Sequence, residues 1–187
     1  MKISVARLLS NFLIAYGISQ AAAPAALATD RQLPISHEEF QQAFNSVASK
    51  NRLQISASEA PYRNPWLNYS VANGIEIGGF VQTSGAIRDL DVTIRFKKTQ
   101  DYAKFLSTVS CLIEVVDPTM VGAEKSDLLS KLGLTQRPNG ELPRTVTERN
   151  GLEYSVRSYD EGQRIYFSVG QSFDAYRAAS SGSHRRT

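Results

Sequence analysis

The sequence predicts an α+β domain built as a two-layer sandwich, with helices packed on one face of an antiparallel sheet made of two three-stranded meanders. First, alternating apolar and polar residues occur in two groups of three runs, and turn residues such as Asn-Gly separate the runs. Second, segments with helical periodicity precede each group, around residues 36–48 and then 99–117 and 123–132. This order is typical of helices segregated to one face of an antiparallel sheet.

Residues 1–28 are typical of a secretory signal peptide. Lys2 and Arg7 give a positive start, residues 8–18 are mostly apolar, and Ala26-Leu27-Ala28 supplies small residues before a cleavage point. The apolar run is too short to span a bilayer comfortably, so a retained anchor is the weaker alternative. We therefore expect a periplasmic or secreted protein with no stable membrane insertion after cleavage.

We expect a single domain over residues 29–177 and a disordered tail over residues 178–187, which is rich in Ser, Gly and Arg. Asn73-Gly74-Ile75-Glu76 matches Asn150-Gly151-Leu152-Glu153 in pattern. This match suggests two half-repeats, 36–97 and 99–170. The alternative is convergence, because Asn-Gly is a common hairpin signal.

The first helix has clear start signals. Ser36 and Glu39 form a capping box, and Ile35 and Phe40 can form a hydrophobic staple. A short strand is expected over residues 53–57. The stretch 59–66 contains two prolines and is expected to be a loop, in which Trp66 anchors to the core or, alternatively, faces a ligand.

The long helix is expected to begin near a Thr99 cap and to end at Asp117-Pro118. Its apolar stripe leaves Cys111, the only cysteine of the chain, on the other side. We expect Cys111 to be a small residue covered by the next helix; a reactive thiol or an intermolecular disulfide is the alternative. Gly133 suits a left-handed cap after the second of these helices.

Turn chemistry predicts the strand registers. We expect three-residue loops at 72–74 and 149–151, and four-residue loops at 82–85 and 159–162. The resulting pairs are Tyr69 with Ile77, Val71 with Ile75, Ile77 with Leu90, Val146 with Tyr154, and Tyr154 with Phe167. One buried face then carries the apolar residues of the second meander, namely Leu152, Tyr154, Val156, Ile165, Phe167 and Val169. Gly78-Gly79 is expected to mark a bulge.

The outward face of the second meander carries the candidate binding site. The predicted register places Arg157 opposite Arg164, and like charges opposed across strands are mildly destabilising. Asp160, Glu161 or an anionic partner could neutralise them. Arg and Tyr are also enriched at interface anchors. Two interpretations stay open. The face is solvated and carries local ion pairs, or it is a partner-binding face built from Arg157, Arg164 and Tyr166, with Arg95.

The usual catalytic and cofactor signatures are not found in the sequence. The histidines are His37 and His184, no Cys/His metal spacing occurs, and there is no phosphate-binding loop or nucleophile elbow. We therefore expect no metal, no cofactor and no enzyme activity. A carboxylate-dependent hydrolase is the least favoured alternative, and its candidate residues are Glu76, Asp89, Asp91 and Glu153.

The charge balance argues against nucleic acid as a partner. The chain has 21 basic and 18 acidic residues, and loss of Lys2 and Arg7 with the leader lowers the net charge from +3 to +1. We expect a non-enzymatic binding protein that engages another protein, as an inhibitor, an immunity-type factor or an envelope-assembly accessory. The alternative is a carrier of a small apolar or anionic ligand.

Overall fold

The computed structural model describes residues 32–59, 65–72, 74–96, 101–136, 142–160 and 163–171. The expected signal peptide (1–28), the tail (178–187) and the Thr99 cap lie outside these described residues.

Three helices and seven strands follow one another along the described chain. The helices are α1 (His37–Lys50), α2 (Asp101–Val116) and α3 (Gly122–Lys131). The strands are β1 (Ser58–Glu59), β2 (Trp66–Ala72), β3 (Ile75–Val81), β4 (Ile87–Arg95), β5 (Thr145–Arg149), β6 (Leu152–Tyr159) and β7 (Arg164–Gln171). Residues 53–57 do not form the predicted strand, and the short strand β1 follows them instead.

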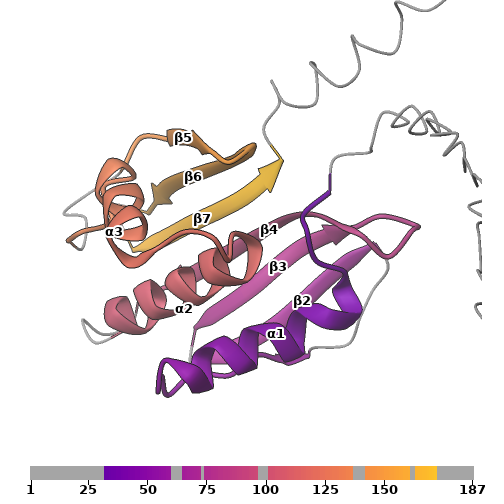
Figure 1. The fold of residues 1–187 in the computed structure, drawn as a ribbon. Helices are drawn as coiled ribbons and strands as arrows, with labels where there is room; N and C mark the ends of the chain where they lie inside the picture. The colour runs from indigo at the N-terminus through magenta and orange to yellow at the C-terminus, as the bar shows by residue number, and fades with distance from the viewer. Residues whose placement is uncertain are drawn as a thin grey trace, which may run out of the picture.

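The strands form one antiparallel sheet in the order β1-β2-β3-β4-β7-β6-β5. The two meanders therefore meet side by side where β4 pairs with β7. All three helices lie on one side of this sheet (Figure 1). The predicted α+β two-layer sandwich is confirmed, whereas the duplication of a half-repeat is not confirmed and stays a prediction.

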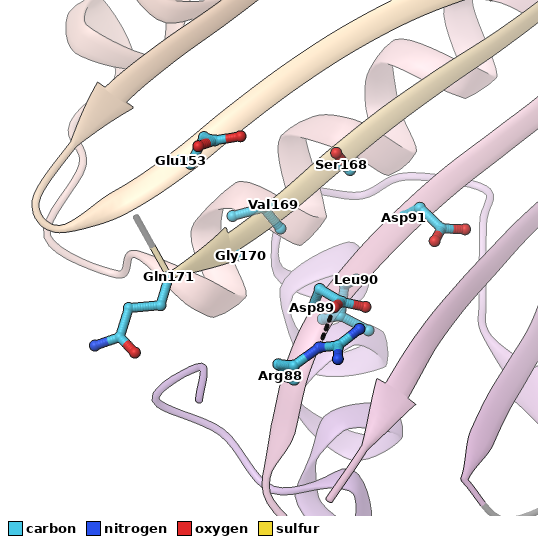
Figure 2. A pocket seen from close by; sticks show the side chains of 9 residues that line it. All are labelled: Arg88, Asp89, Leu90, Asp91, Glu153, Ser168, Val169, Gly170 and Gln171. Carbon is cyan, nitrogen blue, oxygen red and sulfur yellow. Dashed lines mark hydrogen bonds and ion pairs between the residues drawn. The ribbon is translucent and has the colours of Figure 1, made fainter. Parts of the chain in front are cut away.

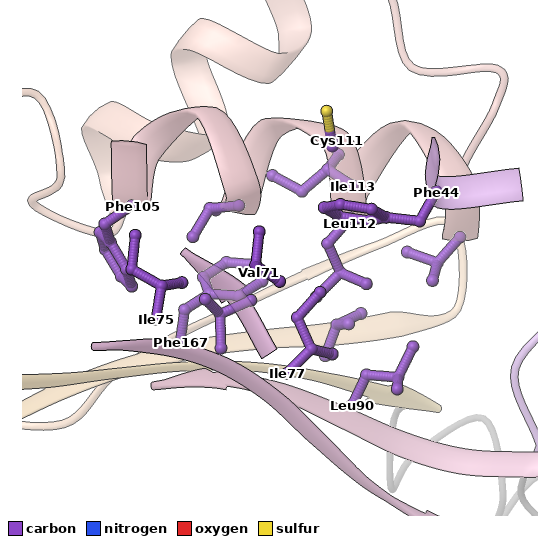
Figure 3. Close-up of a cluster of buried hydrophobic side chains, with 14 of the residues drawn as sticks. Phe44, Val71, Ile75, Ile77, Leu90, Phe105, Cys111, Leu112, Ile113 and Phe167 are labelled. Atoms are coloured by element: carbon purple, nitrogen blue, oxygen red, sulfur yellow. The ribbon is translucent and has the colours of Figure 1, made fainter. Parts of the chain in front are cut away.

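The core lies between the helices and the sheet. Phe44 of α1, together with Phe105 and Leu112 of α2, packs toward Ile77 of β3 and Phe167 of β7, and all five are fully buried (Figure 3). Burying a side chain of this size contributes about 1.5–3 kcal/mol. The inward positions of the second meander are the ones that alternation predicts: Leu152, Tyr154, Val156, Ile165, Phe167 and Val169.

Local signals set the helix ends as the sequence predicts. The backbone N–H of Ser36 and its hydroxyl both donate to Glu39 Oε2, at 3.4 and 2.8 Å, and these bonds lower the pKa of Glu39. After α3, Gly133 adopts φ +73°, and the N–H of Leu134 donates to the carbonyl of Leu129 at 2.8 Å. This backbone conformation suits glycine and closes the helix with Leu134 buried.

The predicted three-residue loop between β5 and β6 is wrong. The corner is a two-residue turn, in which Asn150 (φ +52°) and Gly151 (φ +76°) both take the left-handed conformation. Val146 consequently pairs with Ser155, not with Tyr154, and is 43% exposed. Since β5 is an edge strand, this mismatch of apolar faces is tolerated.

The registers of the other turns also differ from the predicted ones. Tyr69 pairs with Ile77 as predicted, but a bulge between Ser70 and Ala72 places Ala72 opposite Ile75. The second turn of each meander is displaced by two residues. Ile77 therefore pairs with Val92 rather than Leu90, and Tyr154 pairs with Val169 rather than Phe167. A shift of two keeps every side chain on its predicted face.

Gly78 and Gly79 do not form the predicted bulge, because the β3–β4 register is regular at both residues. Both glycines instead allow a close approach from β4. A Cβ at Gly78 would lie 2.8 Å from Asp91 Oδ2, and a Cβ at Gly79 would lie 2.6 Å from the carbonyl oxygen of Asp89. Among the described residues, no helix is long and apolar enough to cross a membrane.

Candidate binding face of the sheet

The sheet surface opposite the helices, here called the outer face, carries the alternate residues of every strand. Alternation along β2 places Leu67, Tyr69 and Val71 inward, so Trp66 points outward with Asn68 and Ser70. The prediction that Trp66 anchors a loop to the core is therefore wrong: it is 60% exposed. The same alternation could have indicated this placement from the sequence.

Trp66 belongs to one of two aromatic groups on the outer face. Its ring meets Phe80 of β3 edge-on, with 5.4 Å between centroids. The guanidinium of Arg88 lies over Phe80, 4.2 Å from the ring centroid, and its Nε is 2.6 Å from Asp89 Oδ2. This group occupies the β2–β4 side of the face.

The second group, here called the arginine–tyrosine cluster, consists of Arg95, Arg157, Tyr159, Arg164 and Tyr166. It contains all four residues that the sequence predicts as a binding site. The Tyr159 and Tyr166 rings are perpendicular, with 5.4 Å between centroids, and the Arg157 guanidinium lies 5.0 and 5.5 Å from them. Arg164 Nη1 donates to the Tyr166 hydroxyl at 3.4 Å.

The predicted opposition of Arg157 and Arg164 is wrong, although both lie on the outer face. The two-residue displacement of the β6–β7 turn pairs Arg157 with Tyr166, and Tyr159 with Arg164. Two arginines do face each other, but they are Arg95 of β4 and Arg164 of β7. Asp160 lies beside both, with its Oδ2 at 2.7 Å from Arg164 Nη2 and 4.0 Å from Arg95 Nη2. This carboxylate offsets the like-charge repulsion.

Two hollows of about 300 Å³ each lie between the aromatic groups, where β4, β7 and β6 run side by side. The first, here called the acidic hollow, is lined by Arg88, Asp89, Asp91, Glu153, Ser168 and Gln171 together with Leu90, Val169 and Gly170 (Figure 2). The second, here called the central hollow, is lined by Asp91, Arg144, Ser155, Arg157, Tyr166 and Ser168. Asp91 and Ser168 line both.

The carboxylate of Asp91 lines both hollows and has a raised pKa. Burial raises its pKa first, the neighbouring charge of Asp89 raises it further, and Arg157 lowers it. The acidic residues named for the hydrolase alternative partly gather here, because Asp89, Asp91 and Glu153 line the acidic hollow. Glu76 does not line it and is exposed on β3. Asp91 is one of the four acids that the sequence indicates for a hydrolase, but it is not among the residues that the sequence predicts for the binding site.

The imidazole of His37 and the thiol of Cys111 lie away from the outer face. The Nδ1 atom of His37 is 3.4 Å from the carbonyl oxygen of Gly85. Cys111 is fully buried, points away from the sheet, and lines a hollow that Leu129 and Lys125 of α3 border (Figure 3). Burial raises the pKa of the Cys111 thiol to about 11, as expected for a cysteine covered by the next helix. Within the described segments, no three His, Cys, Asp or Glu side chains are grouped to hold a metal ion.

Comparison of the chain with protein-family models, with curated proteins and with solved structures gives no match. The site is therefore interpreted from its own chemistry.

Proposed function

We propose that the protein is an exported binding protein that engages another protein through the outer face of its sheet. The observation that carries this proposal is the placement of Trp66 and the arginine–tyrosine cluster at two ends of one helix-free face. Trp, Tyr and Arg are the residue types that most often dominate interface energetics. Trp66 contacts Phe80 but stays 60% exposed, so a partner that covers it gains apolar contact area.

The export part of the proposal rests on residues 1–28. A positive start, an apolar run and small residues up to Ala28 are the features of a cleaved leader. Mass spectrometry of the protein recovered from the cell envelope or medium tests it directly. The expected mature chain begins at Thr29, and an intact Met1 in that fraction would contradict cleavage.

The binding part is tested by substituting the face and measuring capture of a partner. The double variant Arg157→Ala/Tyr166→Ala should change the free energy of unfolding by no more than about 1 kcal/mol, because both side chains lie on the surface of the sheet. Cross-linked pull-down from the source envelope fraction should lose the partner. Trp66→Ala should weaken capture in the same assay.

Lys104→Ala provides the matched control, since this exposed residue of α2 lies in the helix layer. It should retain full capture. Undiminished capture by the Arg157/Tyr166 variant, or equal loss in the Lys104 variant, would remove the outer face as the binding surface.

A further inference from the structure

The charges that line the two hollows are not all paired. Six charged side chains line them: Arg88, Asp89, Asp91, Arg144, Glu153 and Arg157. Four of the six form two ion pairs, since Arg88 Nε lies 2.6 Å from Asp89 Oδ2 and Arg144 Nη2 lies 3.0 Å from Glu153 Oε1. Asp91 and Arg157 are left without an ion pair among the described residues, and both line the central hollow.

Asp91 supplies the negative side of the central hollow from β4. Its carboxylate lies over Gly78 of β3, close enough that a Cβ there would stand 2.8 Å from Oδ2. Asp91 is partly buried, and none of the described residues donates a hydrogen bond to it; the charge of Arg157 lowers its pKa, but the two groups do not form an ion pair. A carboxylate that is partly withdrawn from water is stabilised by any donor that reaches it.

Arg157 supplies the positive side from β6. The rings of Tyr159 and Tyr166, at 5.0 and 5.5 Å from its Cζ atom, hold the guanidinium in place. Such a held guanidinium loses little side-chain freedom when it binds a carboxylate. No described carboxylate lies within ion-pair distance of it.

The two unpaired charges are separated by β7. Neighbouring strands lie about 4.8 Å apart, so the backbones of β4 and β6 are roughly 10 Å apart across β7. Between them, the hydroxyls of Ser155 and Ser168 are 2.7 Å from each other. Only one of the two hydroxyl hydrogens is used in that bond, which leaves one to donate to a ligand.

We propose that the central hollow binds a small zwitterion, namely an amino acid or a dipeptide. The ammonium group of the ligand donates to Asp91, its carboxylate accepts from Arg157, and Ser155 with Ser168 contributes a hydroxyl between them. A simple anion would leave Asp91 unpaired and a simple cation would leave Arg157 unpaired, whereas a zwitterion satisfies both. The volume of about 300 Å³ lies at the lower end of small-molecule sites. The inference needs only the free chain and does not rest on the proposed protein partner.

The test is a titration of the ¹⁵N-labelled full chain, followed by amide NMR, with four probes. L-alanine and L-alanyl-L-alanine carry both charges, whereas propionate and ethylamine carry one each. We expect saturable shifts at Ser155 and Ser168, and at least one zwitterion should bind about tenfold or more tightly than either single-charge probe. Equal binding of propionate would identify an anion site only, equal binding of ethylamine a cation site only, and either result would overturn the proposal.

Three variants assign the binding to the two charges. Asp91→Asn and Arg157→Gln should each weaken zwitterion binding about tenfold or more. Gly78→Ala keeps both charges but displaces the Asp91 carboxylate, so it should weaken binding as well. Glu76→Gln removes an exposed carboxylate outside the hollow and should bind like the wild type. Absence of saturable shifts for both zwitterions, or full binding by Asp91→Asn, would refute the site.

Discussion

Adjacent glycines on β3 allow the close packing of the sheet to be tested on both of its faces at once. Gly79 faces the core, where an added Cβ would lie 2.6 Å from the carbonyl oxygen of Asp89, 2.9 Å from Leu90 Cδ2 and 3.3 Å from Leu67 Cδ1. Gly78 faces the other way, and the three atoms nearest to its Cβ would all belong to the carboxylate of Asp91, with the nearer oxygen at 2.8 Å. An added Cβ at Gly79 would therefore meet a backbone oxygen, which is held by the sheet, whereas an added Cβ at Gly78 would meet a side chain that can rotate.

We expect Gly79→Ala to lower the free energy of unfolding by about 1–3 kcal/mol. Overpacking of a core costs about this much, and here a backbone oxygen of a central strand must shift by several tenths of an ångström. Replacing glycine inside a strand offsets part of the loss, by roughly 0.5–1 kcal/mol, because the unfolded chain loses freedom. Gly78→Ala gains the same offset and meets a side chain that can rotate, so we expect a change within about 1 kcal/mol.

Urea unfolding followed by far-ultraviolet circular dichroism measures both variants. The midpoint should fall clearly for Gly79→Ala and stay close to the wild-type midpoint for Gly78→Ala. Wild-type stability of Gly79→Ala would refute the pairing of Gly79 with Leu90 and the contact with β4. A larger loss in Gly78→Ala than in Gly79→Ala would show that the Asp91 carboxylate is not free to rotate.

Three further predictions concern ionisable and hydrogen-bonding groups. Burial raises the pKa of Asp91 in the folded state, so its ionisation destabilises the fold above the unfolded pKa of about 3.9. Asp91→Asn should therefore be more stable than the wild type in urea unfolding at pH 7. This difference in stability should vanish below about pH 3.9. The thiol of Cys111 is buried and has a pKa of about 11. At pH 8 it should react with a disulfide reagent on the order of 100-fold more slowly in the native protein than in urea. Equal rates would contradict its burial. In Asn150→Gly, glycine still tolerates φ +52°, but the 2.8 Å hydrogen bond from Asn150 Nδ2 to Asp117 Oδ2 is lost. Thermal unfolding should therefore show a free energy of unfolding lower by about 1.5–3 kcal/mol. No measurable change would mean that this bond does not hold the turn.

The sequence predicts the layers and faces because alternation has a period of two. Any even displacement of a turn leaves Phe167 and Val169 inward and Arg164 and Tyr166 outward. Burial of one face thus constrains the fold class strongly. It constrains the register weakly, since registers two residues apart bury the same side chains.

The corner between β5 and β6 shows why the register needed tertiary information. Matching Val146 with Tyr154 on one apolar face requires a three-residue loop, and that is why the sequence predicts one. The structure instead keeps the short Asn-Gly turn, and Asn150 donates to Asp117 at the end of α2, 33 residues away in sequence. That contact involves a residue of another layer, and no local pattern reveals it.

The two-residue displacement of the β6–β7 turn determines which charges on the outer face are paired. In the predicted register Arg157 would oppose Arg164, and both would compete for Asp160. In the observed register Arg164 takes Asp160, and Arg157 lies between two tyrosine rings beside the central hollow. Ser168 moves opposite Ser155 and brings the hydroxyl pair into line with Asp91. A shift of two residues therefore preserves the fold and its exposed face, but it moves the like-charge contact from Arg157 and Arg164 to Arg95 and Arg164, and it leaves Arg157 without an ion pair among the described residues. Since affinity for a charged ligand depends on which charges remain unpaired, the candidate site could only be assigned once the register was known.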